Sequence, residues 1–317
     1  MIRTRRITAE VHSPPVGRLR TGSATAIRRR RIGRHWWGLV FVAPVVAFFA
    51  VFNLFPVVFG FTLSLTDYDL LDPPNFVGLD NFRNLLDDDL FLTALWNTLA
   101  FVAGATFPVW ILSLLAALLF DQVFRGRQLL KTLFFLPVLP PVVVVAVVWR
   151  MLLHPNGIMT WFAGAFRGVT EIQWLTSTAL APLAMISVHD WAVIPFFMLI
   201  WLAGLAGVPP DLREAAQLDG ASPLRTFWHI ELPMLRSTAV LVAALSTINA
   251  FQTFTLQYVL STDPGGPADS TLVLGLLVLK YGFQYFRMGD ASAISVVMFV
   301  IILVVTAIQL WFNRRVA

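Results

Sequence analysis

Long apolar runs alternate with short polar connections along this chain. Each run holds roughly 20 or more residues, which is the length that a helix needs to cross a hydrocarbon core of about 30 Å. The runs lie at Trp36–Leu65, Leu92–Phe120, Leu129–Leu152, Ala181–Val208, Ser237–Leu260 and Ala291–Phe312. This pattern predicts an all-α integral membrane protein with six transmembrane helices.

Several of the predicted spans contain proline, the first and the third among them. The first span contains Pro44 and Pro56, and the third contains Pro137, Pro140 and Pro141. A proline inside a helix removes one backbone hydrogen bond, and within a membrane the freed carbonyl needs another partner. We therefore expect kinks or tilt in the first span, and neighbouring groups that satisfy the freed carbonyls in the third.

Composition agrees with a membrane protein and excludes several kinds of site. Charged residues make up 13% of the chain, whereas soluble domains carry about 25%. There is no cysteine, which excludes a disulfide, a thiolate zinc site and a cysteine nucleophile. The phosphate-binding pattern GxxxxGK[ST] and the catalytic patterns HExxH and GxSxG do not occur. We therefore expect a chain that is not an enzyme and that holds no metal or cofactor of its own.

Arginine and lysine are distributed unevenly between the connections. With the N-terminus in the cytoplasm, 18 of them fall on the cytoplasmic side and four on the outer side. Ten of the 18 lie in residues 1–35. Cytoplasmic connections of membrane proteins are enriched in these residues, so both termini are predicted to be cytoplasmic. We expect residues 1–35 to form a basic, disordered extension that touches anionic lipid headgroups.

The connection at 209–233 is polar although it separates two apolar runs. It reads PPDLREAAQLDGASPLRTFWHIELP. Pro209 and Pro210 can begin a helix, because the first helical turn does not use their missing N–H groups. Gly220 is typical of a helix end, and Ser222-Pro223 is typical of the start of a second short helix. This predicts a helix–turn–helix on the cytoplasmic face that serves for docking.

The same connection resembles the EAA loop in the permease subunits of bacterial ATP-binding-cassette (ABC) importers. The matching positions are Glu214, Ala215, Ala216, Asp219, Gly220, Ala221, Phe227, Ile230, Leu232 and Pro233. The resemblance implies that the segment is a coupling helix, and that the first six of these residues couple the chain to an ATPase. Since the chain has no nucleotide-binding motif, that ATPase must be a separate subunit.

Further motifs extend the resemblance over about residues 36–315. They are Phe76–Phe82, Asn97–Leu99, Gly265–Pro267 with Ser270 and Thr271, and Met288–Ala293. Together they are similar to the carbohydrate branch of these importers, which includes maltose, trehalose and glycerol-3-phosphate permeases. The extra spans and large outer domain of the maltose permease are absent. We therefore expect one compact six-span permease domain at residues 36–317, with its coupling loop at 209–233.

The resemblance also implies a set of partners and a location. The partners are a homologous second permease subunit, two ATP-binding-cassette ATPase subunits that bind ATP and Mg, and an extracytoplasmic sugar-binding protein. The expected location is the bacterial cytoplasmic (inner) membrane, in contact with lipid. Nucleic acid is not an expected partner.

Polar side chains inside the spans point to a substrate path, because they are costly in lipid and usually face a cavity or another helix. In the fifth run Asn249, Gln252, Thr253 and Gln257 recur at three- and four-residue intervals, so they are predicted to share one helical face. Amides and hydroxyls suit sugar hydroxyls, which both donate and accept hydrogen bonds. Interhelical hydrogen bonding is the alternative role for the same residues.

The fourth run adds Asp190, Trp191 and Phe196 to the predicted path. Aromatic rings stack on sugar rings, and a carboxylate can bind hydroxyl groups. The resemblance implies that Phe196 and Thr253 occupy positions of sugar contact. His189 and Asp190 are explained equally well as a structural pair at the membrane edge.

These features predict the permease subunit of an ATP-driven importer that moves a sugar, such as the disaccharides trehalose or maltose, by alternating access. The alternative within the same class is an importer of glycerol-3-phosphate or another polyol. An anionic substrate would favour cations in the path, and apart from Lys131, which counts with the cytoplasmic connection, the spans offer only Arg150. An ion-coupled secondary transporter would predict an inverted repeat and buried carboxylates, whereas Asp190 is nearly alone inside the spans.

Overall fold

The computed structural model describes residues 40–122, 125–168 and 171–316, which form two units divided after Val57. The predicted basic extension, residues 1–35, lies outside the described residues. In the described part, four helices are long and apolar enough to cross a membrane, or six if each of two bent pairs is one span. All six overlap the apolar runs of the sequence, as predicted.

The bounds of most of these spans lie within a few residues of the sequence prediction, whereas the fifth begins and ends earlier than the predicted Ser237–Leu260. The unbroken helices are Val40–Leu63, Asp89–Asp121, Leu180–Ala206 and Met288–Phe312. The bent pairs are Arg127–Val138 with Val142–Leu152, and Pro223–Met234 with Arg236–Gln252. The bends are 94° and 71° respectively. The first lies inside the predicted third helix, which is therefore not continuous, and the second lies at Leu235, just before the predicted fifth helix.

The first span is helical from Val40 to Leu63, and its last part is α2 (Phe55–Leu63). Between residues 50 and 54 the helix widens into a π turn, Ala50–Leu54. This turn ends next to Pro56, whose missing N–H prevents the usual helical hydrogen bond. The irregularity expected from the prolines therefore takes the form of a local π turn.

A small two-stranded ribbon follows the first span. Strand β1 (Thr66–Asp67) pairs antiparallel with β2 (Asn75–Phe76), and α3 (Asp80–Leu86) comes next. The Asn81 side chain donates hydrogen bonds of 2.9 Å to the carbonyl oxygens of Ser64 and Thr66. A Cβ at Gly289 would lie 2.1 Å from the Thr66 carbonyl oxygen, so only glycine allows this close approach of backbone.

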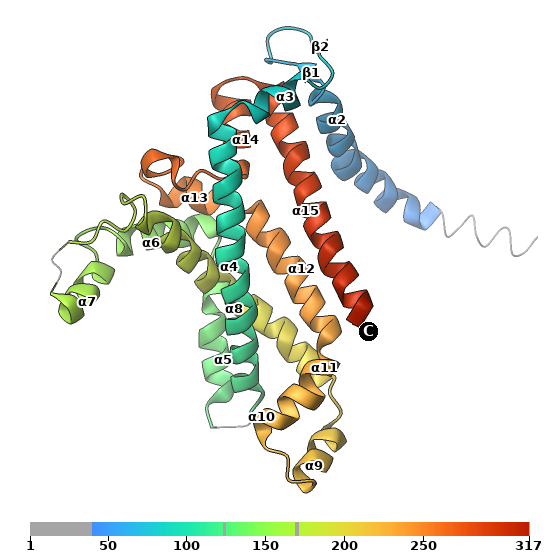
Figure 1. Cartoon of the computed structure of the whole chain (residues 1–317), viewed down its shortest axis with the longest axis vertical. Coiled ribbons are helices and arrows are strands. Elements are labelled where there is room, and N and C mark those ends of the chain that lie inside the picture. Colours follow the sequence, from blue (N-terminus) through green and yellow to red (C-terminus); the bar gives the residue numbers. More distant parts are fainter. Residues whose placement is uncertain (1–39, 123–124, 169–170, 317) are drawn as a thin grey trace, which may run out of the picture. The chain divides into compact units, whose positions relative to one another are not determined.

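Four helices form the core of residues 58–316: α4 (Asp89–Asp121), α8 (Leu180–Ala206), α12 (Arg236–Gln252) and α15 (Met288–Val316). Helix α4 packs along α8, and α12 packs against α4, α8 and α15 (Figure 1). Glycine permits the closest contacts: a Cβ at Gly104 would lie 2.7 Å from Ile186 Cδ1, and one at Gly204 would lie 2.5 Å from Thr238 Oγ1. Small residues let membrane helices approach in this way.

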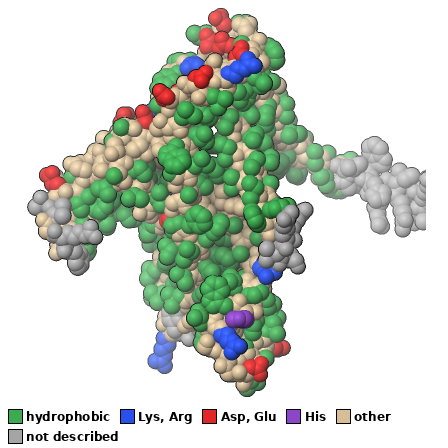
Figure 2. Space-filling view, in the orientation of Figure 1, with side chains coloured by type: hydrophobic (Ala, Val, Ile, Leu, Met, Phe, Trp, Pro, Cys, Tyr) green, Lys and Arg blue, Asp and Glu red, His purple; other side chains and the backbone are tan. Residues whose placement is uncertain are grey.

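Polar side chains inside the bundle bond across helices. The Trp110 indole N–H donates to Ser246 Oγ at 2.7 Å, and the Trp201 indole N–H donates to Ser113 Oγ at 3.1 Å. These bonds join α4 to α12 and to α8, and they satisfy indole groups that lipid could not. Figure 2 shows hydrophobic side chains over the helices, with charged side chains gathered around α3 and around the segment that carries α9.

Shorter helices complete the fold. They are α5 (Arg127–Phe135), α6 (Val142–Leu152), α7 (Ile158–Arg167), α9 (Pro210–Leu218), α10 (Pro223–Thr226), α11 (Leu232–Met234), α13 (Thr255–Leu260) and α14 (Leu274–Leu279). The sequence analysis predicted no helix in the connections that hold α3, α7 and α14. These helices are short and carry turn residues at their ends, so the long apolar runs beside them dominate the sequence pattern.

Candidate functional site

The third span breaks at its proline cluster. Helix α5 continues into a 3₁₀ turn, Leu136–Val138, and α6 begins at Val142 at an angle of 94°. Pro141 is extended, with ψ of 144°. Each of these prolines lacks the N–H that would continue the helix, and the residue before a proline disfavours the helical conformation.

The fifth span also breaks, although its sequence contains no proline or glycine there. Helix α12 ends at Gln252, Thr253 is extended with ψ of 124°, and α13 begins at Thr255. The prediction of one helix from Ser237 to Leu260 is therefore wrong at this point. Tertiary packing explains the break. Leu256 and Leu260 are buried in a core cluster with residues of α4, α6 and α8, and a straight continuation of α12 would take them out of that cluster.

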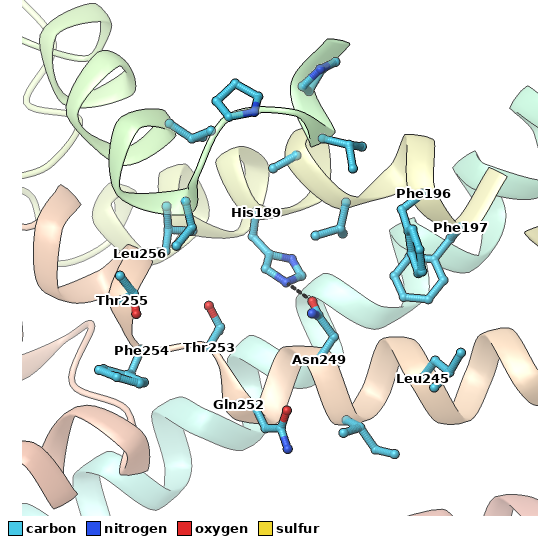
Figure 3. A pocket seen from close by; sticks show the side chains of 18 residues that line it. His189, Phe196, Phe197, Leu245, Asn249, Gln252, Thr253, Phe254, Thr255 and Leu256 are labelled. Carbon is cyan, nitrogen blue, oxygen red and sulfur yellow. Dashed lines mark hydrogen bonds between the residues drawn. The ribbon is translucent and has the colours of Figure 1, made fainter. Parts of the chain in front are cut away.

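Both breaks border one cavity of about 640 Å³ (Figure 3). Its lining residues are Pro137, Val138, Pro140, Val142, Val145, His189, Ala192, Val193, Phe196, Phe197, Leu245, Ile248, Asn249, Gln252, Thr253, Phe254, Thr255 and Leu256. Within a membrane, non-helical backbone is tolerated only where it is buried in protein or lines a cavity. The cavity therefore accounts for both interruptions, and discontinuous helices of this kind mark binding sites in membrane transporters.

The cavity combines neutral polar groups with aromatic rings. Asn249 and Gln252 are exposed on α12, and Phe196 is 45% exposed on α8. His189 Nε2 lies 3.1 Å from Asn249 Oδ1, which links α8 to α12 across the cavity wall (Figure 3). The lining contains no lysine, arginine, aspartate or glutamate, so the described walls offer amide, hydroxyl and aromatic contacts to a ligand.

Four of the seven predicted path residues line this cavity: Phe196, Asn249, Gln252 and Thr253. Gln257 does not, because the break at Thr253 takes α13 out of the α12 helical register, and its side chain is fully buried. The predicted single polar face is therefore limited to the end of α12 and the break itself.

The other two predicted path residues lie beside the cavity rather than in its lining. Asp190 is buried, and its Oδ1 lies 3.1 Å from His189 Nδ1. The Trp191 ring packs edge-on against Trp149, with ring centroids 5.3 Å apart. His189 was not among the predicted path residues, yet it lines the cavity and contacts Asn249. Its position next to the one carboxylate of the α8 sequence was the available signal.

The segment at 209–233 begins and ends its helices where its sequence predicts. Helix α9 begins at Pro210 and ends at Leu218, and Gly220 follows with a positive φ of 75°. A residue with a Cβ would be strained in that conformation. The Ser222 hydroxyl accepts a hydrogen bond from the Arg225 backbone N–H at 3.4 Å and so caps α10.

The predicted coupling residues are mostly accessible on this segment. Glu214, Ala215, Asp219 and Gly220 are exposed, Ala221 is half-buried and Ala216 is buried. Large apolar side chains also face outward, since Leu218 is 90% exposed and Trp228 is 57% exposed. An exposed helix with mixed charge and apolar side chains is suited to packing against another protein.

Arg213 fixes α9 to the rest of the chain. Its NH1 atom donates to Asp121 Oδ2 at 3.0 Å, at the end of α4, and its Nε atom lies 2.7 Å from Glu231 Oε1. Glu231 closes the π turn Phe227–Glu231 that follows α10. All three side chains are partly buried, so one guanidinium holds three elements together by ion pairs.

Comparison with known proteins agrees with this arrangement. Residues 109–317 match the family model described as "Binding-protein-dependent transport system inner membrane component". A trehalose/maltose transport system permease protein, MalF of Thermococcus litoralis, is 32% identical over 282 residues, 87% of this chain and 93% of that protein. The sn-glycerol-3-phosphate transport system permease protein UgpA of Salmonella choleraesuis is 31% identical over 278 residues, 86% of this chain and 92% of that protein.

The fold is shared with a solved transporter. A chain in the crystal structure of a bacterial ABC transporter that imports the acidic polysaccharide alginate superimposes with a TM-score of 0.80, at 23% identity. The match covers 91% of this chain and 98% of that chain. The family match and the relatives establish that this chain belongs to the inner membrane components of binding-protein-dependent transport systems. It is an ABC transporter permease, which is a transport subunit and not an enzyme.

Proposed function

We propose that this permease carries an uncharged sugar, a disaccharide such as trehalose or maltose, through the cavity between α5–α6, α8 and α12–α13. The observation that supports it most is the meeting of two helix breaks at one cavity lined by aromatic rings, amides and hydroxyl groups. Phe196 would stack on a sugar ring, while Asn249, Gln252 and Thr253 would exchange hydrogen bonds with hydroxyl groups.

The charge of the cavity favours a neutral substrate over glycerol-3-phosphate. A phosphate monoester is recognised by arginine, lysine or clusters of backbone N–H groups. The described lining carries no arginine or lysine, and Arg150 is not part of it. The similarity to sugar permeases and to glycerol-3-phosphate permeases is nearly equal, so this argument rests on the cavity and not on the relatives.

The coupling proposal concerns the segment at 209–233. Glu214, Ala215, Ala216, Asp219, Gly220 and Ala221 would contact an ATP-binding-cassette subunit, one of two that bind ATP and Mg beneath this chain and a homologous second permease. ATP-driven closure of those subunits would move α9, and Arg213 would pass the movement to α4. The spans would then alternate between inward-open and outward-open states.

The proposed topology follows from the charge distribution. Both termini and the coupling segment lie in the cytoplasm, and the α3 and α14 regions face outward, where an extracytoplasmic sugar-binding protein would deliver the substrate. The bacterial inner membrane supplies the lipid around the exposed apolar side chains of the spans. This orientation leaves Glu214 and Gly220 within reach of a cytoplasmic ATPase.

Uptake by the reconstituted transporter tests the proposal. The complex of this chain with its permease, ATPase and binding-protein partners is placed in liposomes and offered labelled trehalose, maltose and glycerol-3-phosphate. We expect ATP-dependent uptake of a sugar and none of the phosphate. Uptake of glycerol-3-phosphate alone, or sugar uptake driven by an ion gradient without ATP, would reject the proposal.

A second measurement tests the division of labour between subunits. Because no phosphate-binding loop occurs in its sequence, the purified chain without ATPase subunits should hydrolyse no ATP. Turnover that disappears when residues of this chain are substituted would contradict that expectation. The assembled complex serves as the positive control in the same assay.

A further inference from the structure

His189 and Asp190 form a buried ionisable pair in the middle of an apolar helix. Each residue is 6% exposed, and α8 contains no other charged residue. Asp190 Oδ1 lies 3.1 Å from His189 Nδ1, and His189 Nε2 lies 3.1 Å from Asn249 Oδ1. The Phe101 ring from α4 meets the imidazole edge-on at 5.4 Å and brings no charge. Two polar contacts in series therefore link the Asp190 carboxyl group to the cavity, one with the His189 imidazole and one from that ring to the Asn249 amide.

The direction of the Asn249 amide depends on where this pair keeps its protons. With the amide oxygen facing Nε2, that nitrogen must carry a proton and donate it. Two arrangements satisfy this condition: an imidazolium beside a carboxylate, and a neutral imidazole, protonated at Nε2, whose Nδ1 accepts a hydrogen bond from the O–H of a carboxylic acid. Both arrangements have zero net charge. In the third arrangement Asp190 is ionised and the ring is protonated only at Nδ1, which leaves one net negative charge.

Burial favours the two neutral arrangements. An uncompensated charge inside a membrane span is costly, whereas a hydrogen-bonded neutral pair is much less so. The low dielectric therefore disfavours the ionised arrangement. A neutral pair with its ring proton on Nδ1 alone would leave Nε2 facing the Asn249 oxygen with no proton between them, whereas a proton on Nε2 matches the 3.1 Å contact and holds that oxygen toward α8. The two N–H groups of the same amide are then free of the histidine and turn toward the cavity that Asn249 lines (Figure 3).

We propose that His189 and Asp190 are positioning residues that make Asn249 a hydrogen-bond donor to the substrate. The ligand class that follows is an uncharged molecule that presents oxygen lone pairs at this point, such as a sugar hydroxyl, ring or glycosidic oxygen. The inference rests on the proposed sugar function and deepens it. It assigns a role to the one ionisable side chain among the described cavity-lining residues.

The position of the proton can be measured directly. Solid-state ¹⁵N NMR on the full transporter complex, labelled at histidine and embedded in lipid, distinguishes a protonated from an unprotonated imidazole nitrogen. The spectrum of a His189→Gln complex, subtracted from the wild type, isolates this residue. We expect a protonated Nε2 at neutral pH in the wild type and in Asp190→Glu, which keeps the carboxyl group. In Asp190→Asn the protonation should shift at least partly to Nδ1.

A transport readout separates positioning from a merely structural role. We expect Asp190→Asn to lower the number of sugar molecules carried per ATP hydrolysed by about threefold to tenfold, the equivalent of one lost hydrogen bond. Trehalose and maltose are the probes, each loaded on the binding protein at saturation. ATP hydrolysis stimulated by the loaded binding protein should stay within about twofold, and Asp190→Glu should restore most of the transport.

Each result bears on the inference. An unprotonated Nε2 in the wild type would overturn it, as would an Asp190→Asn complex with the wild-type proton position and the wild-type ratio of sugar to ATP. A variant that lost hydrolysis and transport together, without a change in the proton position, would also overturn it. If the wild type carries neither sugar, the proposed substrate fails, and the ¹⁵N spectra still decide whether Asp190 controls the Asn249 amide.

Discussion

Two side chains connect helices through polar contacts: Arg213 in the segment at 209–233, the proposed docking segment, and His189 at the cavity. They differ in charge, because the contacts of Arg213 are ion pairs and those of His189 form an arrangement with no net charge. Arg213 is a full cation, partly exposed, that faces the carboxylates of Asp121 and Glu231. His189 is buried and faces one carboxylate and one amide. The first site is held by three charges near water, whereas the second is arranged as a neutral pair inside an apolar helix.

The difference follows from what surrounds each site. Near water, charges remain hydrated while they pair, so ion pairs can fix α9 without a large desolvation penalty. Inside a span, every polar group must be satisfied by protein, and a net charge is costly. The cavity therefore relies on amides, hydroxyl groups and aromatic rings.

The largest effects are expected at the exposed surface of the docking segment. Glu214→Ala removes a carboxylate that lies in the N-terminal half of α9 and faces outward. Gly220→Trp places a bulky side chain where φ is 75°. Either change should lower sugar-stimulated ATP hydrolysis and uptake by more than about tenfold, or release the ATPase. Both rates, and the ATPase retained on affinity-purified complex, are the measurements.

The insertion of these two variants provides the control. No membrane span changes in either variant, so both should reach the membrane in wild-type amounts. A Cβ at Gly220 would meet no heavy atom within 4 Å, so Gly220→Ala should cost only the backbone strain and retain more coupling than Gly220→Trp. Wild-type assembly and hydrolysis in both Glu214→Ala and Gly220→Trp would contradict the docking assignment.

A smaller loss is expected when the ion pairs behind the docking surface are removed. Arg213→Ala leaves Asp121 and Glu231 partly buried without their cation, at a cost of about 1–2 kcal/mol after allowance for solvent screening. The link from α9 to α4 should loosen, so uptake per ATP should fall by about threefold to tenfold. Arg225→Ala is the matched control, because Arg225 is exposed in the same segment. Equal losses of uptake per ATP in the two variants would mean that the overall charge of the segment matters, and not the ion pairs of Arg213 with Asp121 and Glu231.

The docking segment was predictable because its structure is set locally. Pro210 begins the helix, Gly220 ends it with a positive φ, and Ser222 caps the next one, each through its own backbone chemistry. The spacing of the residues between them needs no knowledge of distant parts of the chain. The bounds of its helices could therefore be predicted from the sequence alone.

The cavity was only partly predictable because distant contacts shape it. The break at Thr253 has no proline or glycine, so a continuous helix was the natural expectation, and Gln257 was placed on the wrong face. The prolines at 137–141 were expected to be accommodated within one span, whereas the third span breaks there with an angle of 94°. Asn249, Gln252 and Thr253 were found because polar side chains in an apolar span stand out.

Cavity substitutions should have a moderate effect on transport and little effect on assembly. Thr253→Val replaces a hydroxyl by a methyl group of similar size, and Asn249→Leu removes the amide that meets His189. Each should lower the uptake rate by about threefold to thirtyfold, corresponding to one or two lost hydrogen bonds to the substrate. Thr132→Val is the control, since Thr132 is exposed on α5 and bonds only its own helix. Unchanged uptake in both cavity variants would reduce these residues to a packing role.

The smallest effect is expected where a charge already lies in water, at Asp69 in the connection between β1 and β2. Its carboxylate accepts hydrogen bonds from the backbone N–H groups of Asp72 at 2.9 Å and Leu71 at 3.0 Å. These bonds lower the pKa of Asp69 below its ordinary value, with the bond from Asp72 as the larger cause. A lowered pKa in the folded state means that the contribution to stability is present above the ordinary carboxyl pKa and is lost as the pH falls through the lowered one.

Asp69→Ala should therefore lower the Tm of the complex slightly, by about 1–2 °C at pH 7. The difference in Tm from wild type should shrink as the pH falls below about 4. Thermal unfolding of both proteins at the two pH values measures this. A decrease in Tm as large as the one that Arg213→Ala causes would show that exposure to water does not set the size of these electrostatic effects. A difference in Tm between Asp69→Ala and wild type that grows at low pH would show the same.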